Sequence, residues 1–265
     1  MRRPDVFTLD YAHPLAQGLV ILYLPSMDSR QDKISLFHTP KNSKDLNLVN
    51  VSKVADELVF APGENSKILI GDYSNFIPWG AFSFAAHGTV RNAANRNQKI
   101  FGSFTGRQAS FEVDNVGPIY LRLWSGNHAH WVRNDLYSGK SSFAITRNLG
   151  YSRFFVDGVV KNSVSNGSTG TTGFANLHMG SVNADADAAN MRLSAYAFWN
   201  RELSIAEVEM FSDRTDPMLG GLVKEHWPTV YFDMGSTPGT PIPAPTGLYG
   251  IAQTQAITWY WTPGE

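Results

Sequence analysis

The sequence contains no cysteine among its 265 residues. This excludes disulfides, thiolate metal sites and cysteine nucleophiles. Charge is also sparse: 17% of the residues are charged, the formal net charge is −1, and Lys and Arg are scattered singly. A chain without blocks of like charge predicts neither nucleic acid nor an anionic membrane as a partner.

Long hydrophobic runs are missing as well. The longest near the N-terminus is GLVILYL, residues 18–24, far shorter than the roughly 20 apolar residues that span a bilayer. The basic MRR at the start is followed directly by Pro4 and Asp5, so no signal peptide is predicted. We therefore expect no membrane insertion, and synthesis in a host cytoplasm followed by assembly into something larger.

The chain has enough apolar material for a substantial core, with 43% hydrophobic and 12% aromatic residues. Short alternating or apolar runs recur between Gly, Asn, Ser and Pro clusters, and about a dozen strands at this spacing indicate an all-β fold. We predict a two-sheet antiparallel jelly-roll sandwich with one short helix. The candidate core aromatics are Phe82, Phe84, Phe101, Phe111, Tyr120, Phe143, Phe155 and Phe198.

Two local signals are sharper than the rest. Asp157-Gly158, inside the apolar stretch 151–162, predicts a hairpin with a type I′ turn. Ser204 with Glu207 three residues later predicts a capping box at the start of a short helix that ends near Phe211.

The composition divides the chain into three parts: an N-terminal arm at 1–12, a jelly-roll domain at 13–232, and a C-terminal arm at 233–265. The stretch 235–247 is rich in Pro and Gly, as linkers are. The stretch 248–261 has the pattern of two strands but is too short to hold a core alone. It must pair with another chain, lie on its own body, or be mobile.

Several motifs together resemble a known family. The FFVDG turn at 154–158 and the run Asn200, Arg201, Leu203, Ser204 and Glu207 look like those of concanavalin A-like, laminin-G-type jelly rolls. The HPLAQGLV segment at 13–20 resembles the opening of such domains in phage and prophage proteins. The resemblance covers about residues 9–215 and implies a two-sheet jelly roll. The tail at 244–263 resembles the first two strands of a fibronectin type III domain.

The same resemblance raises the question of hydrolysis. Jelly-roll glucanases of the laminarinase type carry E-x-D-x-x-E, or the shorter E-x-D-x-E, on one strand. FEVDNV supplies Glu112 and Asp114, but the third position would be Val116 or Gly117. Because retaining hydrolysis needs a carboxylate on either side of the bond, we expect no enzyme activity. In that case Glu112 and Asp114 are solvent-facing strand residues.

Two groups of residues are candidates for binding a metal. His128 and His130 are spaced to share one face of a strand, but no third ligand can be named, and an ordinary strand or loop pair is the alternative. Asn183, Asp185 and Asp187 follow a strand and offer about three oxygens toward Ca²⁺, which needs six to eight. Apart from this Ca²⁺ hypothesis we predict no cofactor.

A second candidate site would bind sugars. In the stretch 119–131, Trp124 and Trp131 flank Asn127, His128 and His130, and exposed aromatics beside Asn and His suit sugar stacking and hydroxyl recognition. The alternative is that one Trp belongs to the core and the other to an interface.

Three functional hypotheses follow. The first is a non-enzymatic virion protein of a tailed phage, for capsid decoration or in a tail or fibre. It would assemble through its arms as a homo-oligomer such as a trimer, contact major capsid or tail proteins, and touch host-surface polysaccharide. The second is a glycan-binding adhesion module. The third is a glucanase that uses Glu112.

Overall fold

The computed structural model describes residues 6–25, 33–34, 46–61, 66–78, 80–90, 98–102, 109–113, 118–123, 127–132, 140–165, 174, 176–180, 190–213, 221–226, 249–253 and 256–260. The chain forms two compact units, Met1–Trp227 and Pro228–Glu265. Within the residues just given, no helix has the length and apolar character needed to cross a membrane.

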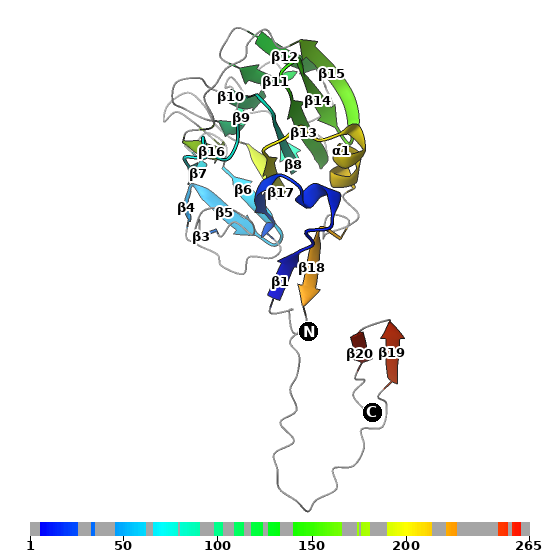
Figure 1. Ribbon diagram of the computed structural model, residues 1–265. Helices are drawn as coiled ribbons and strands as arrows, with labels where there is room; N and C mark the ends of the chain where they lie inside the picture. The colour runs from blue at the N-terminus through cyan, green and yellow to red at the C-terminus, as the bar shows by residue number, and fades with distance from the viewer. Residues whose placement is uncertain are drawn as a thin grey trace, which may run out of the picture. The chain divides into compact units, whose positions relative to one another are not determined.

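The first unit contains two large antiparallel sheets (Figure 1). The sheet that packs against the helix is called the first sheet. Its strands, in spatial order, are β15 (Val159–Ser165), β14 (Tyr151–Val156), β13 (Ser141–Arg147), β8 (Phe82–Val90), β17 (Met191–Trp199), β6 (Glu57–Phe60) and β5 (Val51–Val54). The second half of β17 also pairs with β2 (Leu19–Tyr23).

The other large sheet is called the second sheet. Its strands, in spatial order, are β12 (Asn127–Val132), β11 (Pro118–Leu123), β10 (Ala109–Val113), β9 (Gln98–Gly102), β16 (Leu177–Gly180), β7 (Lys67–Gly71), β4 (Leu46–Val49) and β3 (Lys33–Ile34). Its edge strand β12 lies against β15 and β14 of the first sheet. The predicted all-β sandwich is confirmed.

The main core lies between the two sheets, because its buried side chains come from both. Phe84, Phe143 and Phe198 belong to the first sheet, and Phe101 and Met179 to the second. The Phe84 ring lies 4.5 Å from the Phe101 ring and 5.0 Å from the Phe198 ring, centroid to centroid. Rings at such distances add to the stability gained from burial alone.

A second core lies on the opposite face of the first sheet, under the α-helix α1 (Ile205–Ser212) and the 3₁₀-helix η1 (Pro14–Ala16). Val208 and Phe211 of α1 pack with Phe155 and Trp199 of the sheet. Phe155, a predicted core aromatic, therefore lies beneath the helix and not between the sheets. Because both faces of the first sheet are covered, β8 and β13 are buried along their whole length, although both carry polar side chains among the apolar ones.

Both sharp local predictions are confirmed. Asp157 and Gly158 join β14 to β15 with φ of 50° and 77°, the positive values that a type I′ turn requires. Ser204 caps α1, and its side chain and that of Glu207 form the reciprocal bonds of a capping box.

Two smaller ribbons complete the described structure. β1 (Val6–Leu9) pairs with β18 (Val223–His226), so the stretch predicted as an N-terminal arm contains a strand that pairs within its own chain. The ion pair between Lys224 and Asp10, 2.8 Å long, lies beside this ribbon. In the second unit, β19 (Tyr249–Gln253) and β20 (Ala256–Tyr260) form a hairpin in the stretch predicted to hold two strands.

Candidate functional site

The predicted site residues are distributed unevenly over the described structure. Asn127, His128, His130 and Trp131 lie in β12, and Glu112 lies in β10. Outside the described residues lie Trp124, Asp114 and the predicted Ca²⁺ ligands Asn183, Asp185 and Asp187. Within the described part of the chain, no group of three His, Asp or Glu side chains is arranged to hold a metal.

Strand register brings Glu112 and His130 onto one row of the second sheet. β10, β11 and β12 are consecutive antiparallel neighbours, in which His130 is opposite Tyr120 and Tyr120 is opposite Glu112. On the other side of β10, Glu112 is opposite Lys99 of β9. Neighbouring strands lie about 4.8 Å apart, so this row extends over about 14 Å.

A parallel row contains the other predicted histidine. His128 is opposite Arg122, Arg122 is opposite Ser110, and Ser110 is opposite Gly102. Gly102 is in turn opposite His178 of β16. On β10, β11 and β12 the two rows are two residues apart, and residues two apart on a strand share a face, so both rows lie on the same face of the second sheet. On β9 the rows are three residues apart because the β9–β10 register shifts between Phe111 and Glu112.

This face is the one directed away from the sandwich core. Phe111 is opposite Phe101, which is opposite Met179, and both Phe101 and Met179 are buried between the sheets. The row of Phe111 is therefore the inner one, and its sequence neighbours Ser110 and Glu112 belong to the outer face. We call this surface the outer face of the second sheet.

Register also separates the five predicted sugar-binding residues. Trp131 is opposite Ile119, and Asn127 is opposite Leu123, positions that alternation assigns to the inner face. His128 and His130 belong to the outer face. Tyr120, a predicted core aromatic, shares their face and not that of Phe111. The structure thus groups the two histidines with Glu112, Tyr120 and Arg122, and not with Trp131.

The solvent exposure of the outer face differs from one strand to the next. On β7, Leu69 is 57% exposed, whereas His178 on the neighbouring strand β16 is only 5% exposed. The Nδ1 atom of His178 lies 2.8 Å from the carbonyl oxygen of Asn176. The β7 end of this face is therefore open to solvent, and the position of His178 is covered.

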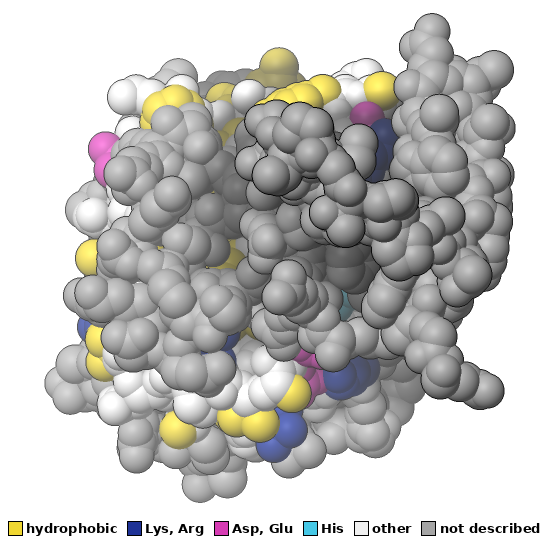
Figure 2. Space-filling view, turned by 90° about the horizontal axis from the view of Figure 1, so that it is seen from below, with side chains coloured by type: hydrophobic (Ala, Val, Ile, Leu, Met, Phe, Trp, Pro, Cys, Tyr) yellow, Lys and Arg dark blue, Asp and Glu magenta, His cyan; other side chains and the backbone are white. Residues whose placement is uncertain are grey.

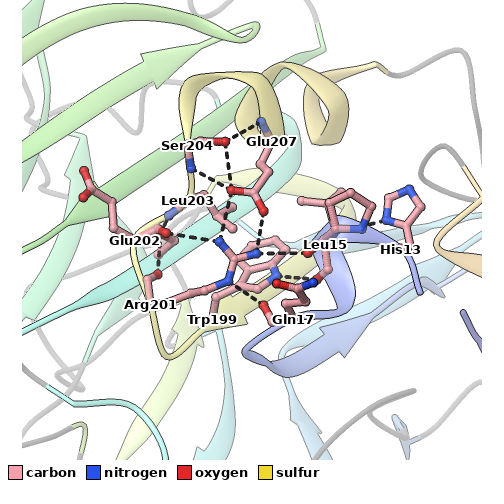
Figure 3. Close-up of polar contacts among 11 residues, drawn as sticks. His13, Leu15, Gln17, Trp199, Arg201, Glu202, Leu203, Ser204 and Glu207 are labelled. Atoms are coloured by element: carbon pink, nitrogen blue, oxygen red, sulfur yellow. Dashed lines mark hydrogen bonds and ion pairs between the residues drawn. The ribbon is translucent and has the colours of Figure 1, made fainter. Parts of the chain in front are cut away.

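A densely hydrogen-bonded polar cluster lies elsewhere, between α1 and η1 on the first sheet (Figure 3). The Arg201 guanidinium donates to the carbonyl oxygens of Gln17 at 2.7 Å and Pro14 at 3.0 Å. It also forms two bonds with the Glu207 carboxylate, at 2.6 and 3.0 Å. Beside it, Trp199 Nε1 donates to the Leu15 carbonyl oxygen at 2.7 Å. These bonds join the chain's 13–18 segment to the start of α1.

Electrostatics at this cluster favour an ionised carboxylate. Burial acts to raise the pKa of Glu207, but hydrogen bonds from Arg201 and Ser204 outweigh it and hold the pKa below its ordinary value of 4.5. The hydrogen bonds of Arg201 and Glu207 drawn in Figure 3 join them to each other, to backbone groups and to the Ser204 hydroxyl. This geometry indicates a structural clamp, not a ligand site.

A second polar group joins the β13–β14 turn to the residue after Arg201. Glu202 accepts from Asn148 Nδ2 at 2.6 Å and from Arg153 Nη1 at 3.4 Å. The Arg153 guanidinium also lies 4.2 Å from the centre of the Tyr151 ring, a cation–π contact. Both carboxylate oxygens of Glu202 are thus engaged within the fold, and we regard this group as structural too.

A family model for the concanavalin A-like lectin/glucanases superfamily matches residues 62–209, more than half of the chain. The chain belongs to this superfamily. The matched range of this laminin G-like domain runs from just before β7 into α1 and contains both rows on the second sheet. No curated protein matches the sequence, and nothing in the comparisons indicates a phage origin.

Solved structures share the fold at low identity. The sialidase of Trypanosoma rangeli has a TM-score of 0.58 and 16% identity over 77% of this chain and 34% of its own. The binding domain of botulinum neurotoxin serotype G has a TM-score of 0.56 and 13% identity over 73% of this chain and 50% of its own. The binding domain of Paraclostridial Mosquitocidal Protein 1 has a TM-score of 0.57 and 16% identity over 75% of this chain and 52% of its own. This superfamily domain thus spans about a third of the sialidase and half of the two binding domains.

Sequence reasoning missed the assignment of three residues to the outer face: Lys99, Tyr120 and Arg122. The signal for Tyr120 and Arg122 was available, because they alternate with Ile119 and Leu121 in the apolar run of β11. Their position beside Glu112 and His130 was not, since it depends on which strands pair.

Proposed function

We propose that this superfamily domain is a non-enzymatic glycan-binding module, and that the glycan lies across the outer face of the second sheet. One observation carries the proposal: register gathers Tyr120, Arg122, Glu112, His128 and His130 on a single face. An aromatic ring beside groups that donate and accept hydrogen bonds is the combination that sugars require. Membership in a superfamily of lectins and glucanases supports the proposal.

The same rows argue against hydrolysis at this face. A retaining glycosidase holds two carboxyl groups about 5 Å apart. Glu112 is the only acidic residue in the eight strands of the second sheet. Wild-type protein and Glu112→Gln should therefore both release no reducing sugar from β-glucans. Turnover that disappears in Glu112→Gln would establish the glucanase instead.

Binding is tested with a glycan array, followed by titration calorimetry on the best ligand. Tyr120→Ala and Arg122→Gln should each weaken binding at least tenfold, with thermal unfolding unchanged. The matched control is Arg192→Gln, which removes a half-exposed arginine from the first sheet and should bind like wild type. Full affinity in both outer-face variants, or no glycan bound by the wild type, would overturn the proposal.

Assembly in a tailed-phage virion is a secondary proposal. It rests on the HPLAQGLV segment at 13–20 and on the two predicted arms. The segment also has a structural explanation, since its carbonyl groups bind Arg201. Light scattering on the full chain and on a 13–232 truncation tests it: a defined oligomer for the first and a monomer for the second would support assembly through the arms.

A further inference from the structure

Positive charge gathers on the outer face of the second sheet. Chain-wide, 22 Lys and Arg nearly balance 23 Asp and Glu. On this face register places Lys99 opposite Glu112, and Arg122 two positions from Tyr120 on the neighbouring strand. Two more lysines follow at the other end of the face: Lys67 of β7 is opposite Val49, and Lys33 of β3 is opposite Asn47.

The assignment of these two lysines to the outer face follows from their neighbours. Ile68, next to Lys67, is fully buried between the sheets, and Leu48, opposite Ile68, packs against the same core. Alternation then assigns Lys67, Val49, Asn47 and Lys33 to the outer face. In the eight strands, this face therefore carries four Lys or Arg residues and one acid, Glu112, with His128, His130 and His178 among them.

On the described part of the first sheet, by contrast, Lys and Arg pair with Glu. In the view of Figure 2, some of the coloured Lys and Arg side chains lie next to Asp or Glu, and others lie among hydrophobic and uncharged groups. On the first sheet, Glu57 pairs with both Lys140 and Arg192, and Arg153 pairs with Glu202. The strands of the second sheet place four Lys or Arg residues but only one carboxylate, that of Glu112, on the outer face. The strand residues of this face therefore carry a net positive charge.

We infer that the ligand of this face is an acidic glycan, one that carries carboxylate or sulfate groups. The inference rests on the proposed function and adds the ligand's charge. Arg presents a fork of donors that matches a carboxylate or sulfate, and Lys supplies a point charge. The four cations lie on every second strand, β11, β9, β7 and β3, and are therefore about 10 Å apart, the length of about two sugar units. An extended chain laid across the strands can meet Arg122 and Lys99 at one end of the face, or Lys67 and Lys33 at the other, on either side of the covered position of His178. The lone Glu112 would oppose an acidic sugar.

The experiment measures affinity for matched pairs of oligosaccharides that differ only in one carboxylate or sulfate group. The acidic member should bind at least tenfold more tightly at low ionic strength, and the preference should shrink as salt rises toward 0.5 M. Arg122→Gln should weaken acidic-glycan binding at least tenfold and neutral-glycan binding less, whereas Lys99→Gln should weaken acidic-glycan binding about fivefold while changing the neutral member less than twofold. Glu112→Gln should strengthen acidic-glycan binding about twofold, and the control Arg192→Gln should change neither.

The outcomes separate this inference from the proposed function. Neutral members that bind as tightly as their acidic partners would overturn the acidic ligand and leave glycan binding standing. The absence of binding to any member would overturn both. A single-stranded DNA oligonucleotide of equal charge serves as a second probe, and equal affinity for it would overturn the inference, because the face would then attract any polyanion.

Discussion

Removal of the Arg201 side chain should destabilise the first unit strongly although the residue is 28% exposed. The guanidinium bonds three carbonyl oxygens, those of Pro14, Gln17 and Glu202, as well as the Glu207 carboxylate. At a partly exposed site each carbonyl bond contributes about 1 kcal/mol. Solvent screening limits the ion pair to less than about 1 kcal/mol. The sum predicts a loss of about 3 kcal/mol for Arg201→Ala.

For a domain of this size that loss corresponds to a decrease in Tm of about 10 °C. Urea and thermal unfolding followed by far-UV circular dichroism measure it. Arg201→Lys should recover less than half, since an ammonium cannot reproduce the fork. In Arg192→Ala the lost guanidinium is 48% exposed and lies 3.7 Å from the Glu57 carboxylate, so the loss should be no more than about 0.5 kcal/mol. An Arg201→Ala protein within 0.5 kcal/mol of wild type would refute the clamp.

Three further predictions concern single residues. Because the pKa of Glu207 is lower in the folded protein, its ionised carboxylate stabilises the fold at pH values above the ordinary pKa, and this contribution disappears as the pH falls through the lowered pKa. Between about pH 5 and 3 the Glu207→Gln protein should therefore lose less stability than wild type, as measured by urea unfolding. In Gly88→Ala, the new methyl group would collide with the Arg192 carbonyl oxygen on β17, and thermal unfolding should show a loss of about 2 kcal/mol or more. Trp131→Ala should lower stability by about 3 kcal/mol and change glycan affinity less than twofold, because register assigns Trp131 to the inner face; lost affinity with unchanged stability would return Trp131 to the binding site.

The sequence predicted features that depend on neighbouring residues. The alternation of strands, the Asp157-Gly158 turn and the Ser204 capping box each require contacts over a few positions only, and all three are present. The partners of Arg201 are different: the bonds to Pro14 and Gln17 cross 187 and 184 positions of the chain. The motif that contains Arg201 was recognisable, but its role as a clamp required the fold.

The candidate site shows the same limit. Sequence proximity grouped Trp131 with His128 and His130, although alternation along β12 separates them. Conversely, Glu112 and His130 looked unrelated and meet on one row because β10, β11 and β12 form a meander. Pairing decides which polar residues become neighbours, and pairing is set by packing of the inner face, for which the polar residues themselves carry no information.

The layered architecture separates stability from the proposed binding. The Arg201 clamp and the α1 core lie on the outer face of the first sheet, whereas the proposed glycan face is the outer face of the second, and the core between the sheets lies between them. Substitutions on one outer face therefore need not disturb the other, which makes the affinity and stability measurements independent.

The 13–24 segment, which precedes the residues of the family match, contributes to the core under α1. Leu15 and Leu22 are fully buried there, and β2 pairs with the second half of β17. A domain defined by the matched residues alone would lack the carbonyl groups that hold Arg201 and would expose Trp199, which the intact chain buries completely.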